Sequence, residues 1–404
     1  MADSSYQGYK PRPELIPITR ARLDPAKPFD YIVQLNGDAP APPVEASASM
    51  PFTGITADGH VVPDLYRVED TGLDPAPAVE AARVLLAALS PAQRSRVTLP
   101  VDATAWRMWT NAYPGWEPDG VYLDDLGETQ REAVTELLRA SLSSRGFADV
   151  RTTMRLNGAL GQLIGQYNDT LIEWAYWIRL FGEPSANGPW GWQLFGHHVC
   201  VSCFVLGRQM VLTPTFLGAE FESQQIFDEH RRVGLELVLA LSPAQRNKAV
   251  LYPSMRPEDL PWELAGRVDG RHLGGAGQDN RVIRYAGLPA DSMTPGQQDL
   301  LIRLVASFTS RMPDGPAAAK LAEVRRYLGS AHFAWIGQAD DDSPCYFRVH
   351  SPVVLAEYDN HPGVFLDFDQ PEPWHVHTVI RTPNGNDYGT DLLRQHYARH
   401  HQTV

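Results

Sequence analysis

Two histidines, His375 and His377, are separated by a single residue in a stretch with the composition of a β-strand. Side chains alternate between the two faces of a strand, so these imidazoles share one face while Val376 points into the core. Two imidazoles on one face can converge on a single point, as the ligands of a metal ion must. The pair therefore predicts a metal centre at the end of this strand.

Two further residues complete a ligand set, His198 and Glu220. His197 and His198 are neighbours, so only one of them can face a given site in an extended strand. His198 alternates with smaller and more polar residues than His197, which alternates with valines, and we therefore choose His198. Glu220 ends a later strand of the same region, where its carboxylate could turn inward. The predicted ligands are His198, Glu220, His375 and His377.

A set of two or three histidines with one carboxylate is common for catalytic zinc and also for non-haem iron. We expect a divalent transition metal, with zinc preferred and iron as the other possibility. A polar pocket that is lined by histidines and holds no metal is the alternative.

Four residues could serve a substrate or move protons around this centre. Arg381 shares the strand face of the histidine pair, and its planar guanidinium suits a substrate carboxylate. Glu357 could orient an imidazole or act as a general base. Asn386 and Tyr388 offer neutral hydrogen bonds. The competing interpretation pairs Arg381 with a buried carboxylate such as Glu357 or Asp359.

These residues predict a metal-dependent hydrolase that cleaves an amide or ester bond in a small carboxylated metabolite with metal-activated water. A non-haem iron oxygenase is the alternative among enzymes, and a non-catalytic protein that binds an acidic ligand is the alternative from another class. The sequence has no GxSxG motif, P-loop, HExxH motif or GxGxxG motif followed by a helix, so the common nucleotide-dependent classes are excluded.

Composition limits the partners. The net charge of −13 argues against nucleic acid and anionic membranes as partners, because both require basic surfaces. No apolar run approaches the roughly 18 residues of a membrane helix. The N-terminal residues lack the pattern of a secretion signal, and we expect a cytoplasmic protein. A small-molecule substrate is the expected partner, and the sequence indicates no oligomeric state.

Internal repeats indicate the fold. The hexapeptide Leu89–Arg94 recurs as Leu241–Arg246, and two further pairs of similar segments follow in the same order. Each half has helices followed by strands, which predicts an α+β fold with mainly antiparallel sheet and a site between the duplicated halves. The predicted units are an N-terminal extension (1–78) with a β-hairpin at Asp58-Gly59, a first repeat (79–227), and a second repeat with a C-terminal helix (228–404).

Several long motifs resemble the DUF3500 family of bacterial and fungal proteins, from about Pro51 to His400. The segments that carry the resemblance are 190–198, 213–220, 333–337 and 381–397. The name of the family records an unassigned function, so the resemblance implies a fold group and supports the choice of the Gly-His-His and His-x-His segments. The chain departs from the family pattern at Cys203 and Asn360.

Overall fold

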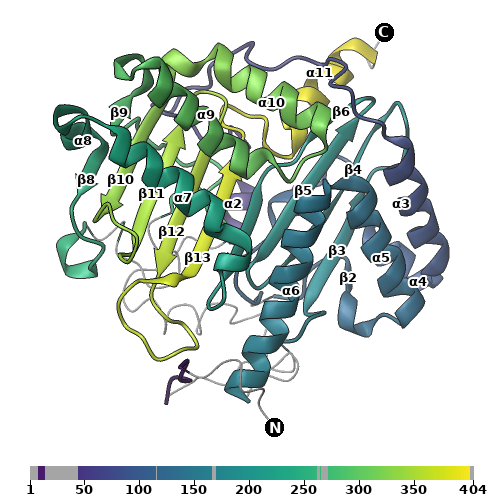
Figure 1. Ribbon diagram of the computed structural model, residues 1–404. Coiled ribbons are helices and arrows are strands. Elements are labelled where there is room, and N and C mark those ends of the chain that lie inside the picture. Colours follow the sequence, from purple (N-terminus) through teal and green to yellow (C-terminus); the bar gives the residue numbers. More distant parts are fainter. Residues whose placement is uncertain are drawn as a thin grey trace.

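The computed structural model describes residues 8–13, 44–114, 116–165, 170–261, 264 and 272–400. Within these ranges one large mixed sheet forms the centre of an α+β fold (Figure 1). Its strands are β1 (Thr98–Leu99), β2 (Val121–Tyr122), β3 (Tyr176–Phe181), β4 (Pro189–Gly196), β5 (Val199–Leu206), β6 (Gln209–Val211), β7 (Thr215–Ala219), β8 (Val250–Tyr252), β9 (Leu288–Pro289), β10 (His332–Gly337), β11 (Cys345–His350), β12 (Leu355–His361) and β13 (Glu372–Arg381).

The strand order runs β1-β3-β4-β5-β7-β13-β12-β11-β10-β8, with β2, β6 and β9 paired at the side of this path. The outermost pairs, β1 with β3 and β8 with β10, are parallel, and the pairs between them are antiparallel. β7 and β13 meet in the middle of the sheet, where His377 lies opposite Gly218. The central strand pair therefore carries His375 and His377, both on β13.

Helices cover one face of this sheet (Figure 1). They are α3 (Ala76–Ala88), α4 (Pro91–Val97), α5 (Glu128–Ser141), α6 (Ser144–Ile164), α7 (Gln224–Ala240), α8 (Pro243–Ala249), α9 (Pro295–Thr309) and α10 (Asp314–Arg326), and the described chain also has α2 (Val44–Ser49) and α11 (Thr390–His400). Short 3-10 turns span Thr104–Arg107, Leu123–Asp125, Pro257–Asp259, Ala290–Ser292, Leu328–Ser330 and Asp387–Gly389. No helix in the described ranges combines the length and the apolar character needed to cross a bilayer.

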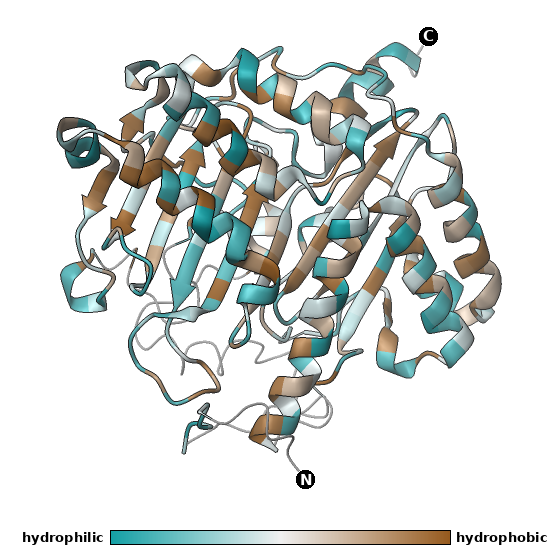
Figure 2. Ribbon diagram, in the orientation of Figure 1, coloured by the Kyte–Doolittle hydropathy of each residue, from teal (hydrophilic) through white to brown (hydrophobic). Residues whose placement is uncertain are grey.

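The two faces of the sheet are closed in different ways. Val199, Leu217 and Ile380 point to the helix side and belong to the main hydrophobic core. The opposite face is covered by chain connections, which form smaller clusters around residues such as Trp109 and Leu273. The strands are mainly hydrophobic along their length, with hydrophilic stretches in β12 and β13 (Figure 2). The site described below lies on the connection-covered face.

The repeated hexapeptide occupies the same position in the two halves of the chain. Each copy follows a long helix and begins a short one, α4 or α8, with Ser90 or Ser242 as the N-cap of a capping box. The capping glutamine of each copy also contacts a glutamine of a later helix, Gln130 in α5 or Gln297 in α9. The α3 and α7 helices begin at Ala76 and Gln224, a few residues before the predicted boundaries. An internal duplication stays our interpretation of this recurrence.

The structure does not contain the hairpin predicted at Asp58-Gly59, because no residues of 51–62 pair across this turn and Thr56 instead forms a β-bridge with Val282. A local turn does form, in which the His60 backbone N–H donates to the Asp58 side chain. The residues before it find their backbone partners far along the chain, since Thr56 bonds the backbone of Arg281 and Ile283. Distant hydrogen bonds thus replace the cross-turn pairing that the sequence suggested.

Candidate metal centre

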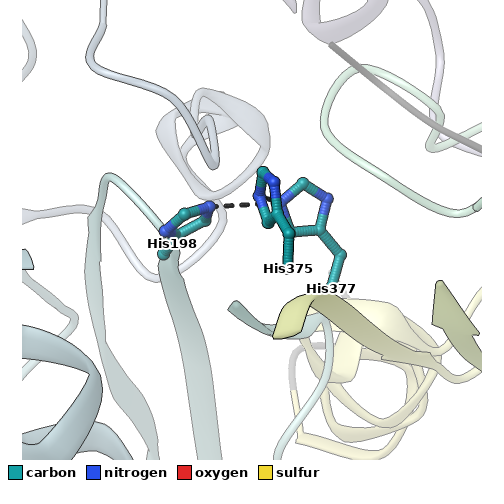
Figure 3. A group of neighbouring side chains, drawn as sticks. All are labelled: His198, His375 and His377. Carbon is teal, nitrogen blue, oxygen red and sulfur yellow. Dashed lines mark hydrogen bonds between the residues drawn. The ribbon is translucent and has the colours of Figure 1, made fainter. Parts of the chain in front are cut away.

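Three imidazoles from the two halves of the chain point toward one another (Figure 3). His198 follows β4 in the tight turn to β5, and His375 and His377 stand on β13. The Nε2 atom of His377 lies 3.1 Å from Nε2 of His198 and 3.2 Å from Nε2 of His375. Two nitrogens bound at 2.0–2.1 Å to one tetrahedral zinc ion lie about 3.3 Å apart. These two separations therefore match the ligand spacing of one transition-metal ion, and one ligand atom of each of the three residues lies within 4.8 Å of the other two.

His198 reaches this position through its backbone conformation. Its φ of +62° is unusual for a residue other than glycine. The conformation is held by two backbone hydrogen bonds, from His198 N–H to the Asn111 carbonyl and from Gly218 N–H to the His198 carbonyl. The neighbouring His197 instead bonds Asn157 through Nδ1 at 2.7 Å. The structure thus brings His198 to the centre from a turn and not from an extended strand, and the His197 ring stacks on the His198 ring with 3.9 Å between their centroids.

Gly218 leaves the space in which the rings meet. A Cβ atom at this position would lie 2.7 Å from Cδ2 of His377 and 2.8 Å from Cδ2 of His198. Carbon atoms at that separation overlap, because their optimal contact distance is about 3.5–4.0 Å. A glycine opposite His377 in the central strand pair is therefore required for His198 to approach.

The carbonyl of Pro362 determines the tautomer of two histidine rings, His375 and His361. Nδ1 of His375 lies 2.7 Å from this oxygen, and Nδ1 of His361 lies 3.0 Å from it. A carbonyl oxygen can only accept, so each Nδ1 carries the hydrogen and, in the neutral ring, Nε2 presents its lone pair. A backbone carbonyl that holds a ring in this form is a regular feature of metal-binding histidines.

Burial keeps these imidazoles neutral. The exposed fraction is 5% for His198, 0% for His375 and 3% for His377. Removal from water, and then the nearby histidines, hold the pKa of each of the three well below the ordinary value of histidine. Neutral rings with available lone pairs are the form that binds a metal ion.

Glu220 lies beside this group without joining it. It follows β7 directly, and continuing the β7–β13 register by one position sets it opposite His375. Its Oε1 accepts three backbone N–H groups, from Val364, Phe365 and Leu366. Burial, partly offset by these hydrogen bonds, raises the pKa of Glu220 to about 7. The carboxyl thus holds the loop that supplies Pro362, and it can exchange a proton near neutrality.

Glu357 and Arg381 hold another segment over the same sheet face. Glu357 accepts the backbone N–H groups of Leu273 and Gly274 and the hydroxyl of Tyr346. Arg381 Nη1 donates to the Gly274 carbonyl at 3.0 Å. A Cβ atom on Gly274 would meet both side chains at 3.1–3.2 Å, so the backbone lies tightly between them. Together they form a clamp on residues 273–274.

Two carboxylates occupy the rest of the Arg381 guanidinium. Its Nε donates to Asp387 at 2.7 Å and its Nη2 to Asp279 at 2.5 Å, and all three side chains are buried. Arg381 therefore forms a buried ion pair, as the competing interpretation proposed. Its partners are Asp387 and Asp279 and not the expected Glu357 or Asp359. Arg107 also pairs with Asp279, at 2.8 Å.

Asn386 and Tyr388 lie next to this ion-pair network. The Tyr388 hydroxyl donates to Asp279 at 2.9 Å and accepts from Trp109 Nε1. Asn386 Oδ1 accepts the backbone N–H of Leu392 near the start of α11. Arg381 is four residues from His377 on β13, roughly 13 Å along an extended strand. The structure therefore does not bring Asn386 and Tyr388, which lie beside Arg381, to the histidines.

Three residues at the centre were not among the predicted ligands. Asp359 and His361 stand on β12 on the face of His377, and His272 begins the segment that the clamp holds. Nδ1 of His272 lies 3.5 Å from Oδ2 of Asp359. The alternation of 357, 359 and 361 along one strand was a readable signal for Asp359 and His361. No local pattern marks His272, because its position depends on the clamp.

A single substitution tests the clamp. Arg381→Lys keeps the charge, but its single nitrogen cannot replace the three separate nitrogens through which Arg381 bonds Asp387, Asp279 and the Gly274 carbonyl. We expect the free energy of unfolding to fall by about 3 kcal/mol, the lower end of the cost of breaking a buried ion pair. Arg394→Lys, in an exposed pair with Asp391, is the control and should change melting little. An unchanged melting temperature for Arg381→Lys would refute the structural role.

The fold and the site define a class: an α+β protein with one large sheet and a buried histidine cluster at its central strand pair. The chain belongs to the DUF3500 family, because the family model, described as a protein of unknown function, matches residues 72–390. The matched range contains the predicted ligands and both sides of the clamp. No curated protein and no solved structure matches the chain.

Proposed function

We propose that this protein is a metal-dependent enzyme that hydrolyses an amide or ester bond in a small metabolite, with zinc held by His198, His375 and His377. The observation that carries the proposal is the spacing of the three Nε2 atoms, 3.1 and 3.2 Å between neighbours. Three histidines are a known ligand set of catalytic zinc, which leaves a fourth position for water.

Zinc in such a set supplies a bound water of lowered pKa and polarises a carbonyl group. The protein contributes orientation and proton transfer. Pro362 keeps the Nε2 lone pair of His375 directed at the site. Glu220, opposite His375 and with a pKa raised to about 7 by burial, is the group that we assign to proton uptake and release. Glu357 is assigned to the clamp on residues 273–274 instead.

The proposed substrate class is broader than the one that the sequence suggested. A substrate carboxylate was inferred from Arg381, and Asp279 and Asp387 already occupy that guanidinium. An amide or ester of a small molecule remains, with no requirement for a carboxylate. We also keep a cytoplasmic location, which fits the three free and buried cysteines.

The position of the ligands supports a site between two related halves. His198 belongs to the first half of the chain, and His375 and His377 belong to the second. The equivalent capping boxes of α4 and α8 support the duplication on which this idea rests. We propose that the duplicated halves meet at β7 and β13 and that the metal joins them there.

Metal analysis of purified protein, followed by activity measurements, tests the proposal. We expect transition metal after purification, and metal-dependent cleavage of some members of a panel of small esters and amides after chelation and return of zinc. Activity that returns only with ferrous iron and oxygen would favour the oxygenase alternative. Protein that takes up no transition metal would refute the proposal and leave a ligand-binding protein.

A further inference from the structure

We infer that a second metal position lies next to the first, formed by His272, Asp359 and His377. The inference rests on the proposed function in one respect, since His377 belongs to both positions. It extends the site from one metal ion to a pair, a ligand arrangement that the sequence did not suggest.

The three residues meet the geometric requirement of a cation site. One ligand atom from each of them lies within 4.8 Å of the other two, as in the first group. All three are buried, with exposed fractions of 4% for His272, 0% for Asp359 and 3% for His377. Exposed acidic groups gather on many surfaces without binding an ion, whereas a fully buried carboxylate beside two imidazoles has lost its hydration. Two histidines and one carboxylate form a common set for zinc and for non-haem iron.

The ring of His377 can serve both positions. Its Nε2 faces His198 and His375, so this atom belongs to the first position. Its Nδ1 is buried and has no hydrogen-bond partner among the described residues. A neutral imidazole keeps one ring proton, so His377 would bind a second ion through Nδ1 only as an imidazolate, with that proton released to solvent when the second ion binds. The two positions would then share the His377 ring, on the sheet face that also carries Asp359.

The clamp explains how a loop residue can be a ligand. Glu357 binds the backbone N–H of Leu273, directly after His272, at 2.9 Å. Arg381 and Asp279 hold the following turn through the ion pairs described above. These buried hydrogen bonds and ion pairs fix the segment 273–274 against β12. The anchoring residue, Glu357, is two residues before Asp359 on that strand. Its consequence is that His272 is held beside Asp359 and His377.

The stoichiometry of metal binding tests the inference. Chelator-stripped protein is titrated with Zn²⁺ and, in parallel, with Co²⁺, and bound metal is measured by elemental analysis and by the visible spectrum of cobalt. We expect two ions per chain for the unaltered protein. Asp359→Asn and His272→Gln should each lose one ion and keep the other, and Asp340→Asn, at an exposed carboxylate, should keep both.

The outcomes separate this inference from the proposed function. No bound metal in the unaltered protein would refute both. One ion in the unaltered protein that persists in Asp359→Asn would refute the second position alone, and so would two ions that persist in both variants. The titration of the unaltered protein needs no variant, so a misfolded variant leaves the test intact.

Discussion

Replacing His375 and His377 together should remove all bound transition metal from the protein. The two residues provide two of the three nitrogens at the first position, and His377 is shared with the second. The first position would keep only His198 and the second only His272 and Asp359, which are too few ligands to hold a metal ion against exchange with buffer. Elemental analysis after gel filtration measures the effect, and cleavage of any ester or amide substrate should disappear with the metal.

We choose glutamine at both positions, because it keeps much of the buried volume. Alanine would leave a larger cavity and destabilise the protein more. The matched control is His396→Gln with His400→Gln, which removes two histidines from the last helix, away from the candidate site. The control should keep its metal and its melting temperature. Full metal occupancy in the His375/His377 variant, with the protein still folded, would rule out this site as the metal centre.

The sequence was informative where local chemistry decides the structure. Alternation along β13 placed His375 and His377 on one face, and the opposite placement of Cys200 and Cys203 in two different hydrophobic clusters also follows from alternation. Ser90 and Ser242, each followed by proline, are the N-caps of short helices, as expected for this pair of residue types. These features depend on a few consecutive residues, and a single sequence contains all of that information.

The sequence was less informative where contacts between distant segments decide the position and partners of a side chain. Arg381 shares the strand face of the histidines, as predicted, but its partners Asp279 and Asp387 come from a loop and a turn that no local pattern brings together. His272 is placed by the same loop. Glu220 was expected as a ligand because a carboxylate often completes a histidine set, and only the fold shows that its Oε1 binds three consecutive N–H groups.

Acid should destabilise the metal-free protein steeply below pH 6.5. Burial lowers the pKa of His197 and of His350 to about 3, and burial also lowers the pKa of His230 well below its ordinary value. The unfolded chain, with histidine pKa values near 6.5, then binds more protons than the folded chain. Stability is complete above pH 6.5 and is lost as the pH falls toward the folded values, by about 1.4 kcal/mol per pH unit for each group.

Glu220 acts in the opposite direction, because a folded pKa raised to about 7 makes the folded chain bind the extra proton as the pH falls from 7 toward 4.5. His197, His230 and His350 against this one carboxyl contribute a net loss of about 3 kcal/mol per pH unit between pH 6 and pH 5. The site histidines His198, His375 and His377 add to the loss in the same direction. Urea unfolding of chelator-treated protein at pH 7, 6 and 5 measures this slope. His350→Gln should reduce it by about 1.4 kcal/mol per pH unit, because its one titrating group is gone. A stability that stays constant or rises between pH 7 and pH 5 would show that these imidazoles are not held neutral by burial.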